Sequence, residues 1–155
     1  MQQSEKTPEK ILAVMIGIQG SGKSTFFRTH LEKNFIRVNL DTLKTRNREH
    51  LLVASCLAEG KSFAIDNTNP TREDRARYIP SARENGYRII GYVMECDLSA
   101  CIERNNRRVG KERIPEKGIA ATLKRLEPPT FSEGFDELYF VRIVENGFSV
   151  EPFLQ

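Results

Sequence analysis

The hydrophobic residues of the chain fall into short runs that are separated by amphipathic stretches. A continuous apolar run covers residues 11–16, which is typical of a strand buried on both faces. Residues 24–33 contain no Gly or Pro and place apolar side chains at near-helical spacing, so they predict a helix. A glycine-rich turn at residues 17–23 joins the two. The chain therefore begins its regular structure with strand, glycine turn and helix.

The remainder of the chain repeats this alternation. The pattern predicts strands over 35–41, 61–66, 87–96 and 138–144 and helices over 45–59, 71–85, 98–108 and 115–126. Pro80 is expected to kink or interrupt the helix that contains it, and Asn146-Gly147 predicts a hairpin turn near the end. Alternating strands and helices predict an α/β fold with three layers, in which helices flank a parallel sheet.

Length and composition are those of one ordinary globular domain. The sequence has 155 residues, and we expect a single domain over 11–155 after a flexible polar tail at 1–10. No apolar run is long enough to predict a membrane span. The three cysteines show no metal-binding spacing, which favours a reducing, cytoplasmic location. Nothing in the sequence identifies an oligomeric interface.

Charge is concentrated in one segment. The whole chain carries a formal net charge of +3, whereas residues 100–125 contain eight basic and three acidic residues, a balance of +5. The rest of the chain is therefore slightly acidic. A polyanionic ligand would be drawn to the basic segment.

The glycine turn contains a complete phosphate-binding motif, G-x-x-x-x-G-K-S. Its glycines allow consecutive N–H groups to point at one anion, and the following helix adds its positive end. The lysine supplies charge to the outer phosphates, and the serine hydroxyl is placed to ligate Mg²⁺. We therefore expect ATP and Mg²⁺ to bind at Gly17, Gln19, Gly20, Ser21, Gly22, Lys23, Ser24 and Thr25.

Two acidic residues follow predicted strands. Asp41 closes one strand and is a candidate general base, with an N-cap of the next helix as the alternative. Asp66 follows another and is a candidate Mg²⁺ ligand, with an Asx turn as the alternative. Because parallel strands end at one edge of a sheet, both are expected beside the phosphate loop.

Arginines supply the remaining candidates. Arg104, Arg107 and Arg108 lie in the basic segment, at the end of a predicted helix. Such a run is often a solvated helix face, but this position is also where a nucleotide kinase carries a mobile lid that neutralises the transferring phosphoryl group. Arg75 lies in a second basic group, in which nearby acids offer a structural pairing.

Several stretches of the sequence resemble the kinase domain of the polynucleotide 5′-hydroxyl-kinase family, in particular that of the bifunctional polynucleotide kinase-phosphatases that repair strand breaks. The resemblance covers residues 11–143 and rests on I-D-N-T-N-P at 65–70, R-A-R-Y-I at 75–79, R-N-N-R at 104–107 and E-P-P-T-F-S-E-G-F at 127–135. It implies transfer of the γ-phosphate of ATP to the 5′-hydroxyl of a DNA or RNA end.

The resemblance also implies roles for individual residues. Asp41 matches the general base, and Lys23 and Ser24 match the phosphate and Mg²⁺ groups. Arg104 with Arg107 or Arg108 matches the lid arginines. On the acceptor side we place Asp41, Lys44, Asp66, Asn67 and Arg75.

The sequence departs from the family in two places. The family often has Arg immediately before the base, whereas this chain has Asn39-Leu40-Asp41. The aromatic residues that some members place after the base are absent from Lys44-Thr45-Arg46. A P-loop kinase with a nucleoside, sugar or sugar-nucleotide acceptor is therefore the alternative. A purely signalling nucleotide-binding protein is disfavoured because it would need neither Asp41 nor the arginines.

Overall fold

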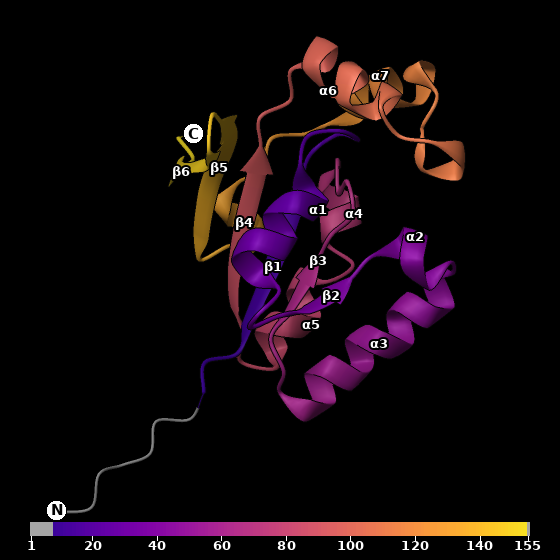
Figure 1. Cartoon of the computed structure of the whole chain (residues 1–155). Helices are drawn as coiled ribbons and strands as arrows, with labels where there is room; N and C mark the ends of the chain where they lie inside the picture. The colour runs from indigo at the N-terminus through magenta and orange to yellow at the C-terminus, as the bar shows by residue number, and fades with distance from the viewer. Residues whose placement is uncertain (1–7, 155) are drawn as a thin grey trace, which may run out of the picture.

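The computed structural model describes residues 8–154, which form one mixed sheet covered by helices (Figure 1). The strand order is β2-β3-β1-β4-β5-β6, and every neighbouring pair is parallel except β5 with β6. The predicted three-layer α/β fold is confirmed, with the antiparallel hairpin at one edge. The strands are β1 (Ile11–Ile16), β2 (Ile36–Val38), β3 (Phe63–Ile65), β4 (Arg88–Met94), β5 (Glu137–Val144) and β6 (Gly147–Pro152).

The helices connect these strands in the expected order. They are α1 (Lys23–Phe26), α2 (Leu40–Leu43), α3 (Arg46–Glu59), α4 (Arg72–Arg75), α5 (Ile79–Glu84), α6 (Leu98–Asn106) and α7 (Glu116–Arg125). Three further helical segments accompany them: the π-helical η1 (Phe27–Leu31), which continues α1, and the 3₁₀ turns η2 (Gly110–Glu112) and η3 (Phe131–Glu133). In Figure 1, α6 and α7 lie together beyond the carboxyl end of β4, as a helical lid would.

The central strand β1 is buried on both faces, which explains its unbroken apolar sequence. Leu12, Val14 and Ile16 pack into one core with residues of β3, α3 and α5. Ala13 and Met15 face the opposite core, which contains Phe26 of α1. Alternate side chains of one strand thus supply two hydrophobic layers.

The structure corrects several predicted boundaries. The strand expected over 35–41 ends at Val38, because Asn39 caps the short helix α2. The helix expected over 71–85 is divided into α4 and α5, with Pro80 in the first turn of α5, where a missing N–H costs little. On α3 the apolar Leu51 is 60% exposed, whereas Glu49 is buried.

Residues 1–7 of the predicted N-terminal tail lie outside the described residues. Glu9 and Lys10, which the prediction also assigned to the tail, make contacts with the body of the domain. The Glu9 carboxylate pairs with Arg88 at 3.0 Å, and Lys10 Nζ donates to the carbonyl of Asn85. Within residues 8–154, no helix is long and apolar enough to cross a membrane.

Candidate active site

The phosphate loop joins β1 to α1 at the carboxyl edge of the sheet. Gly20 and Gly22 have φ of 81° and 98°, which L side chains rarely adopt. A Cβ on Gly20 would lie 2.4 Å from the carbonyl oxygen of Cys101, so this glycine also lets α6 approach the loop. The Gly17 N–H donates to Thr68 O at 3.0 Å, which ties the loop to the turn after β3.

Lys23 lies folded over its own loop. Its ammonium donates to the carbonyl oxygens of Gly17 and Ile18, both at 2.9 Å. The pKa of Lys23 is lowered to about 8, chiefly because burial desolvates the ammonium and also because Arg108 lies nearby, while the Asp66 carboxylate acts in the opposite direction. An arriving phosphate would supply the negative charge that this lysine lacks.

Three buried polar atoms of the loop and lid have no partner among the described residues: Ser21 Oγ, Gln19 Oε1 and Arg104 Nη1. Buried polar groups are normally paired, so the two unpaired donors at the phosphate loop, Ser21 Oγ and Arg104 Nη1, fit an anionic ligand, whereas Gln19 Oε1 can only accept. Arg104 also donates through Nε to Gly20 O at 3.1 Å, and Gln19 donates to Thr122 at 3.2 Å. The lid helices α6 and α7 are thus already docked on the loop.

Two oxygen groups that fit a Mg²⁺ ion lie together beside the loop. The Ser24 hydroxyl donates to Asp66 Oδ2 at 3.2 Å, and Asp66 is only 2% exposed. Mg²⁺ takes oxygen ligands and commonly uses one or two protein groups together with substrate phosphates. This pair therefore has the chemistry of such a site, and it consists of the two residues predicted as metal ligands, Ser24 and Asp66.

Asp41 lies in the first turn of α2 with an exposed carboxylate. It is not the N-cap, which was the alternative role: that cap is Asn39, whose Oδ1 accepts from the Thr42 N–H at 3.0 Å. Asn39 also donates to Asp66 O at 2.6 Å, so the helix that bears Asp41 starts beside the turn that bears Asp66. Lys44 ends α2 with φ of 77°, and it is exposed.

The three lid arginines differ in their surroundings. Arg104 and Arg108 are half-buried, whereas the Arg107 side chain is 72% exposed and pairs with Glu103 one turn away. The loop that follows α6 is fixed by Asn105, which is bonded to both backbone polar groups of Ile114. Arg104 reaches the phosphate loop through its bond to Gly20 O, Arg108 lies near enough to Lys23 to lower its pKa, and Arg107 lies toward solvent.

Two predicted acceptor residues have structural contacts instead. Arg75 is fully buried, and its guanidinium forms two bonds with Glu133, at 2.7 and 3.1 Å, and two with the carbonyls of Asn69 and Pro70. We therefore correct its assignment to substrate binding, because the side chain is fully buried and four of its five N–H groups already donate within the domain. Asn67 accepts from the Leu40 N–H at 2.9 Å and thereby positions α2.

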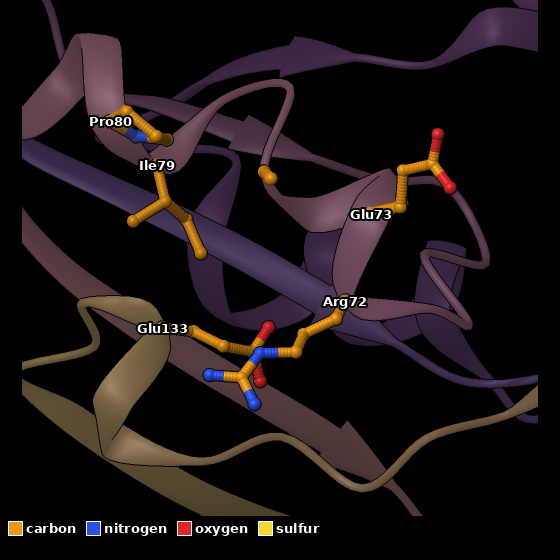
Figure 2. A pocket seen from close by; sticks show the side chains of 6 residues that line it. Arg72, Glu73, Ile79, Pro80 and Glu133 are labelled. Atoms are coloured by element: carbon orange, nitrogen blue, oxygen red, sulfur yellow. The ribbon is translucent and has the colours of Figure 1, made fainter.

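A separate hollow of about 280 Å³ lies beside this buried pair. Figure 2 shows Arg72 of α4 and Glu133 of η3 on one side of it and Ile79 with Pro80 of α5 on the other. Its lining includes none of the residues of the phosphate loop, α2 or the lid. The candidate site is instead the open edge between α1, α2 and α6.

The comparisons with known proteins agree with this geometry. The family model described as an AAA domain matches residues 12–129, more than half of the chain. The chain belongs to this family. A "Putative bifunctional polynucleotide phosphatase/kinase" of Acanthamoeba polyphaga mimivirus is 33% identical over 140 residues, which cover 86% of this chain and 33% of that protein. This AAA domain thus spans about a third of the length of that relative.

Solved structures show the same fold for this AAA domain. One is the "Pnkp1/Rnl/Hen1 RNA repair complex", with a TM-score of 0.65 and 22% identity over 81% of this chain and 47% of the matched chain. Another is a gluconokinase from Sinorhizobium meliloti, with a TM-score of 0.59 and 19% identity over 91% and 86%. Both likenesses concern the fold.

Two polar residues of this AAA domain site were missed by the sequence reasoning, and both come from β2 and its end. Arg37 pairs with Asp66, and Asn39 links Asp66 to α2. An arginine within a short alternating strand gave a weak signal, since its alignment with Asp66 depends on the pairing of β2 with β3. Asn39 carried a clearer signal, because Asn is a preferred N-cap residue and its side chain can accept from the N–H three residues later, here that of Thr42.

Proposed function

We propose that the chain is an ATP-dependent kinase that transfers the γ-phosphate to the 5′-hydroxyl of a DNA or RNA end. The donor half of this proposal is supported by the phosphate loop and by the unpaired donors Ser21 Oγ and Arg104 Nη1 around it. The acceptor half is supported by the position of Asp41 and by the polynucleotide phosphatase/kinase that the chain resembles. Each half has its own residues and its own test.

The donor phosphates would bind in the loop between α1 and α6. Backbone N–H groups of the loop donate to them, and Lys23 moves from its carbonyl partners to the outer phosphates. Arg104 and Arg108 come from the lid side and neutralise charge that develops on the γ-phosphoryl group. Ser24 and Asp66 would hold Mg²⁺, which neutralises phosphate charge as a Lewis acid when bound.

Asp41 would act on the acceptor. Its carboxylate accepts the proton of the 5′-hydroxyl as that oxygen forms its bond to the γ-phosphorus, and the bond to the ADP leaving group breaks. Lys44, at the end of the same helix, provides a cation for a phosphate of the acceptor strand. Asp41 is exposed and therefore accessible to a substrate.

The observation that carries the proposal is the attachment of α2 to the turn after β3. Two bonds make this attachment: Asn39 Nδ2 to Asp66 O at 2.6 Å, and the Leu40 N–H to Asn67 Oδ1 at 2.9 Å. A helix of four residues has little stability of its own, so these bonds fix its place. They hold an accessible carboxylate at the rim that also carries the phosphate loop.

The test is transfer of labelled γ-phosphate from ATP to oligonucleotides that end in a 5′-hydroxyl, as DNA and as RNA. Asp41→Asn should lose at least a hundredfold in kcat, in line with removal of a general base, while the Kd for ATP stays within about twofold. Glu145→Gln is the matched control, because it neutralises an exposed carboxylate in the β5–β6 turn. Absence of transfer to any nucleic-acid end would refute the proposal.

A small-molecule acceptor is the second candidate. It is favoured by the lack of an aromatic residue from Leu40 to Arg46, where a stacking platform for a terminal base would be placed. Salt separates the candidates: the acceptor affinity of a polynucleotide kinase falls steeply as salt rises, because bound counterions are released from the strand. A nucleoside or sugar acceptor has no such strand, so its affinity should change little.

A further inference from the structure

Arg37 occupies an unusual place at the edge of the phosphate site. It lies on β2 opposite Ala64 of β3, and its guanidinium carbon is 5.9 Å from the centre of the Phe27 ring. Nε and Nη2 both lie 2.8 Å from Asp66 Oδ2, and Nη2 also donates to the Ser24 hydroxyl at 3.0 Å. One guanidinium nitrogen thus contacts both oxygen groups that fit a metal ion.

The buried negative charge of Asp66 explains why a cationic side chain lies beside it. The Asp66 side chain is 1% exposed, and a buried carboxylate without a partner is strongly unfavourable. Lys23 acts on Asp66 through its charge, but its ammonium donates hydrogen bonds to the loop carbonyls. Arg37 is therefore the cation that directly compensates Asp66 in the nucleotide-free protein.

The two partners differ in their freedom to move. Asp66 is enclosed and is held by its backbone, since its N–H donates to Val38 O and its carbonyl accepts from Asn39. The Arg37 side chain is 35% exposed, and its guanidinium lies near an aromatic ring at the border of solvent. If a second cation arrives at Asp66, Arg37 is the group that can withdraw.

We propose that Arg37 is a positioning residue that stands in for the divalent cation at the Ser24–Asp66 pair and is displaced when the metal binds with nucleotide. The inference rests on the proposed function, because it takes Mg²⁺ and ATP as the ligands. Arg37 keeps the Ser24 hydroxyl and Asp66 together before the metal binds. It also opposes metal binding without nucleotide, since two positive groups compete for one carboxylate oxygen.

The test measures Mg²⁺ and ADP binding rather than transfer. Arg37→Met removes the charge and keeps an apolar stem beside Phe27, and Arg77→Met makes the same change at an exposed arginine as the control. The first measurement is thermal unfolding in EDTA and in Mg²⁺ without nucleotide. Arg37→Met should lower Tm in EDTA and show a larger rise in Tm with Mg²⁺ than wild type, whereas Arg77→Met should match wild type.

The second measurement is binding of a fluorescent ADP analogue across a Mg²⁺ titration. The half-saturating Mg²⁺ concentration should fall about tenfold in Arg37→Met, as expected when one like charge is removed a few Å from a divalent ion in a partly hydrated site. At saturating Mg²⁺ the Kd for ADP should stay within about twofold. Arg37→Lys should lie between wild type and Arg37→Met, and it serves as the test if the methionine variant does not fold.

Three results would overturn the proposal. An unchanged or higher Mg²⁺ requirement in the Arg37 variants would mean that Arg37 does not compete with the metal. Equal weakening of ADP binding with and without Mg²⁺ would make Arg37 a phosphate ligand. If Mg²⁺ changed neither the Tm nor ADP binding, in the wild type or in Arg37→Met, the Ser24–Asp66 pair would not be a Mg²⁺ site. None of these measurements contains an acceptor, so failure of nucleic-acid phosphorylation leaves them unchanged.

Discussion

The pKa of Lys23 links nucleotide binding to pH. Free Lys has a pKa near 10.4, whereas burial lowers that of Lys23 to about 8 in the nucleotide-free protein. Phosphate oxygens beside the ammonium favour its charged form, so binding raises the pKa again. Above pH 8 the protein must therefore take up a proton in order to bind nucleotide, and the affinity falls as pH rises.

The magnitude follows from that pKa. At pH 7 about nine-tenths of the Lys23 side chains are charged, and at pH 9 about one-tenth are, so the Kd for ATP should rise about tenfold between these two values. The γ-phosphate, with a last pKa near 6, is already about nine-tenths ionised at pH 7, so its own titration changes the affinity little over this range. The same pKa also affects folding: between pH 8 and 10 the unfolded chain binds more protons at Lys23 than the native one, so this residue makes stability increase with pH.

Titration calorimetry measures both effects. ATP is titrated at pH 7, 8 and 9 in buffers with different enthalpies of ionisation, which gives the Kd and the number of protons taken up. We expect uptake to approach one proton at pH 9 and to vanish at pH 7. In Lys23→Met, binding should be weaker and its pH dependence over this range should disappear. A constant Kd in the wild type, or the same pH dependence in Lys23→Met, would refute the assignment of this pKa to Lys23.

Two further variants test structural assignments. Arg75→Met should lower the free energy of unfolding by about 3–5 kcal/mol in urea denaturation, because Glu133 remains buried without its partner. The double variant Arg75→Met/Glu133→Leu should recover most of this loss. An Arg75→Met protein that is as stable as wild type and fails only in acceptor binding would restore the substrate role of Arg75. Asn39→Ala should cost about 1–2 kcal/mol and reduce kcat with the Kd for ATP unchanged, because α2 loses its cap and its bond to Asp66 O. Asn39→Asp keeps the cap acceptor and loses the donor, so a kcat equal to wild type in that variant would show that the Asp66 bond does not position Asp41.

The donor half of the site was predictable because its parts are close in sequence. The phosphate loop combines its glycines, lysine and serine within nine residues, and its conformation follows from local backbone preferences and the flanking strand and helix. Pairing of the predicted parallel strands then places Asp66 beside it. The apolar runs also predicted β1, β3 and β4, since burial of both sheet faces leaves an unbroken hydrophobic sequence.

Other assignments failed where the same residue type serves two purposes. Arg75 and Arg104 both lie on helices near the site, yet Arg75 is buried on Glu133, while Arg104 keeps a nitrogen without a partner beside the phosphate loop. What separates them is a partner 58 residues away in the sequence, which no local pattern reveals. Glu49 is a similar case: its carboxylate is buried because Tyr78 and Asn67 donate to it, although the apolar Leu51 on the same helix is exposed.

The rim of the sheet explains why the acceptor is harder to infer than the donor. Phosphates are recognised largely by backbone N–H groups, whose arrangement is fixed once the loop has formed. The acceptor is met by α2, a single turn whose place depends on Asn39, Asn67 and the buried Glu49 behind them. Small changes in those distant contacts would move Asp41 without altering the phosphate loop. Domains with one phosphate loop can therefore diverge in the hydroxyl that they phosphorylate, and the contacts that hold α2 are where such specificity should be sought.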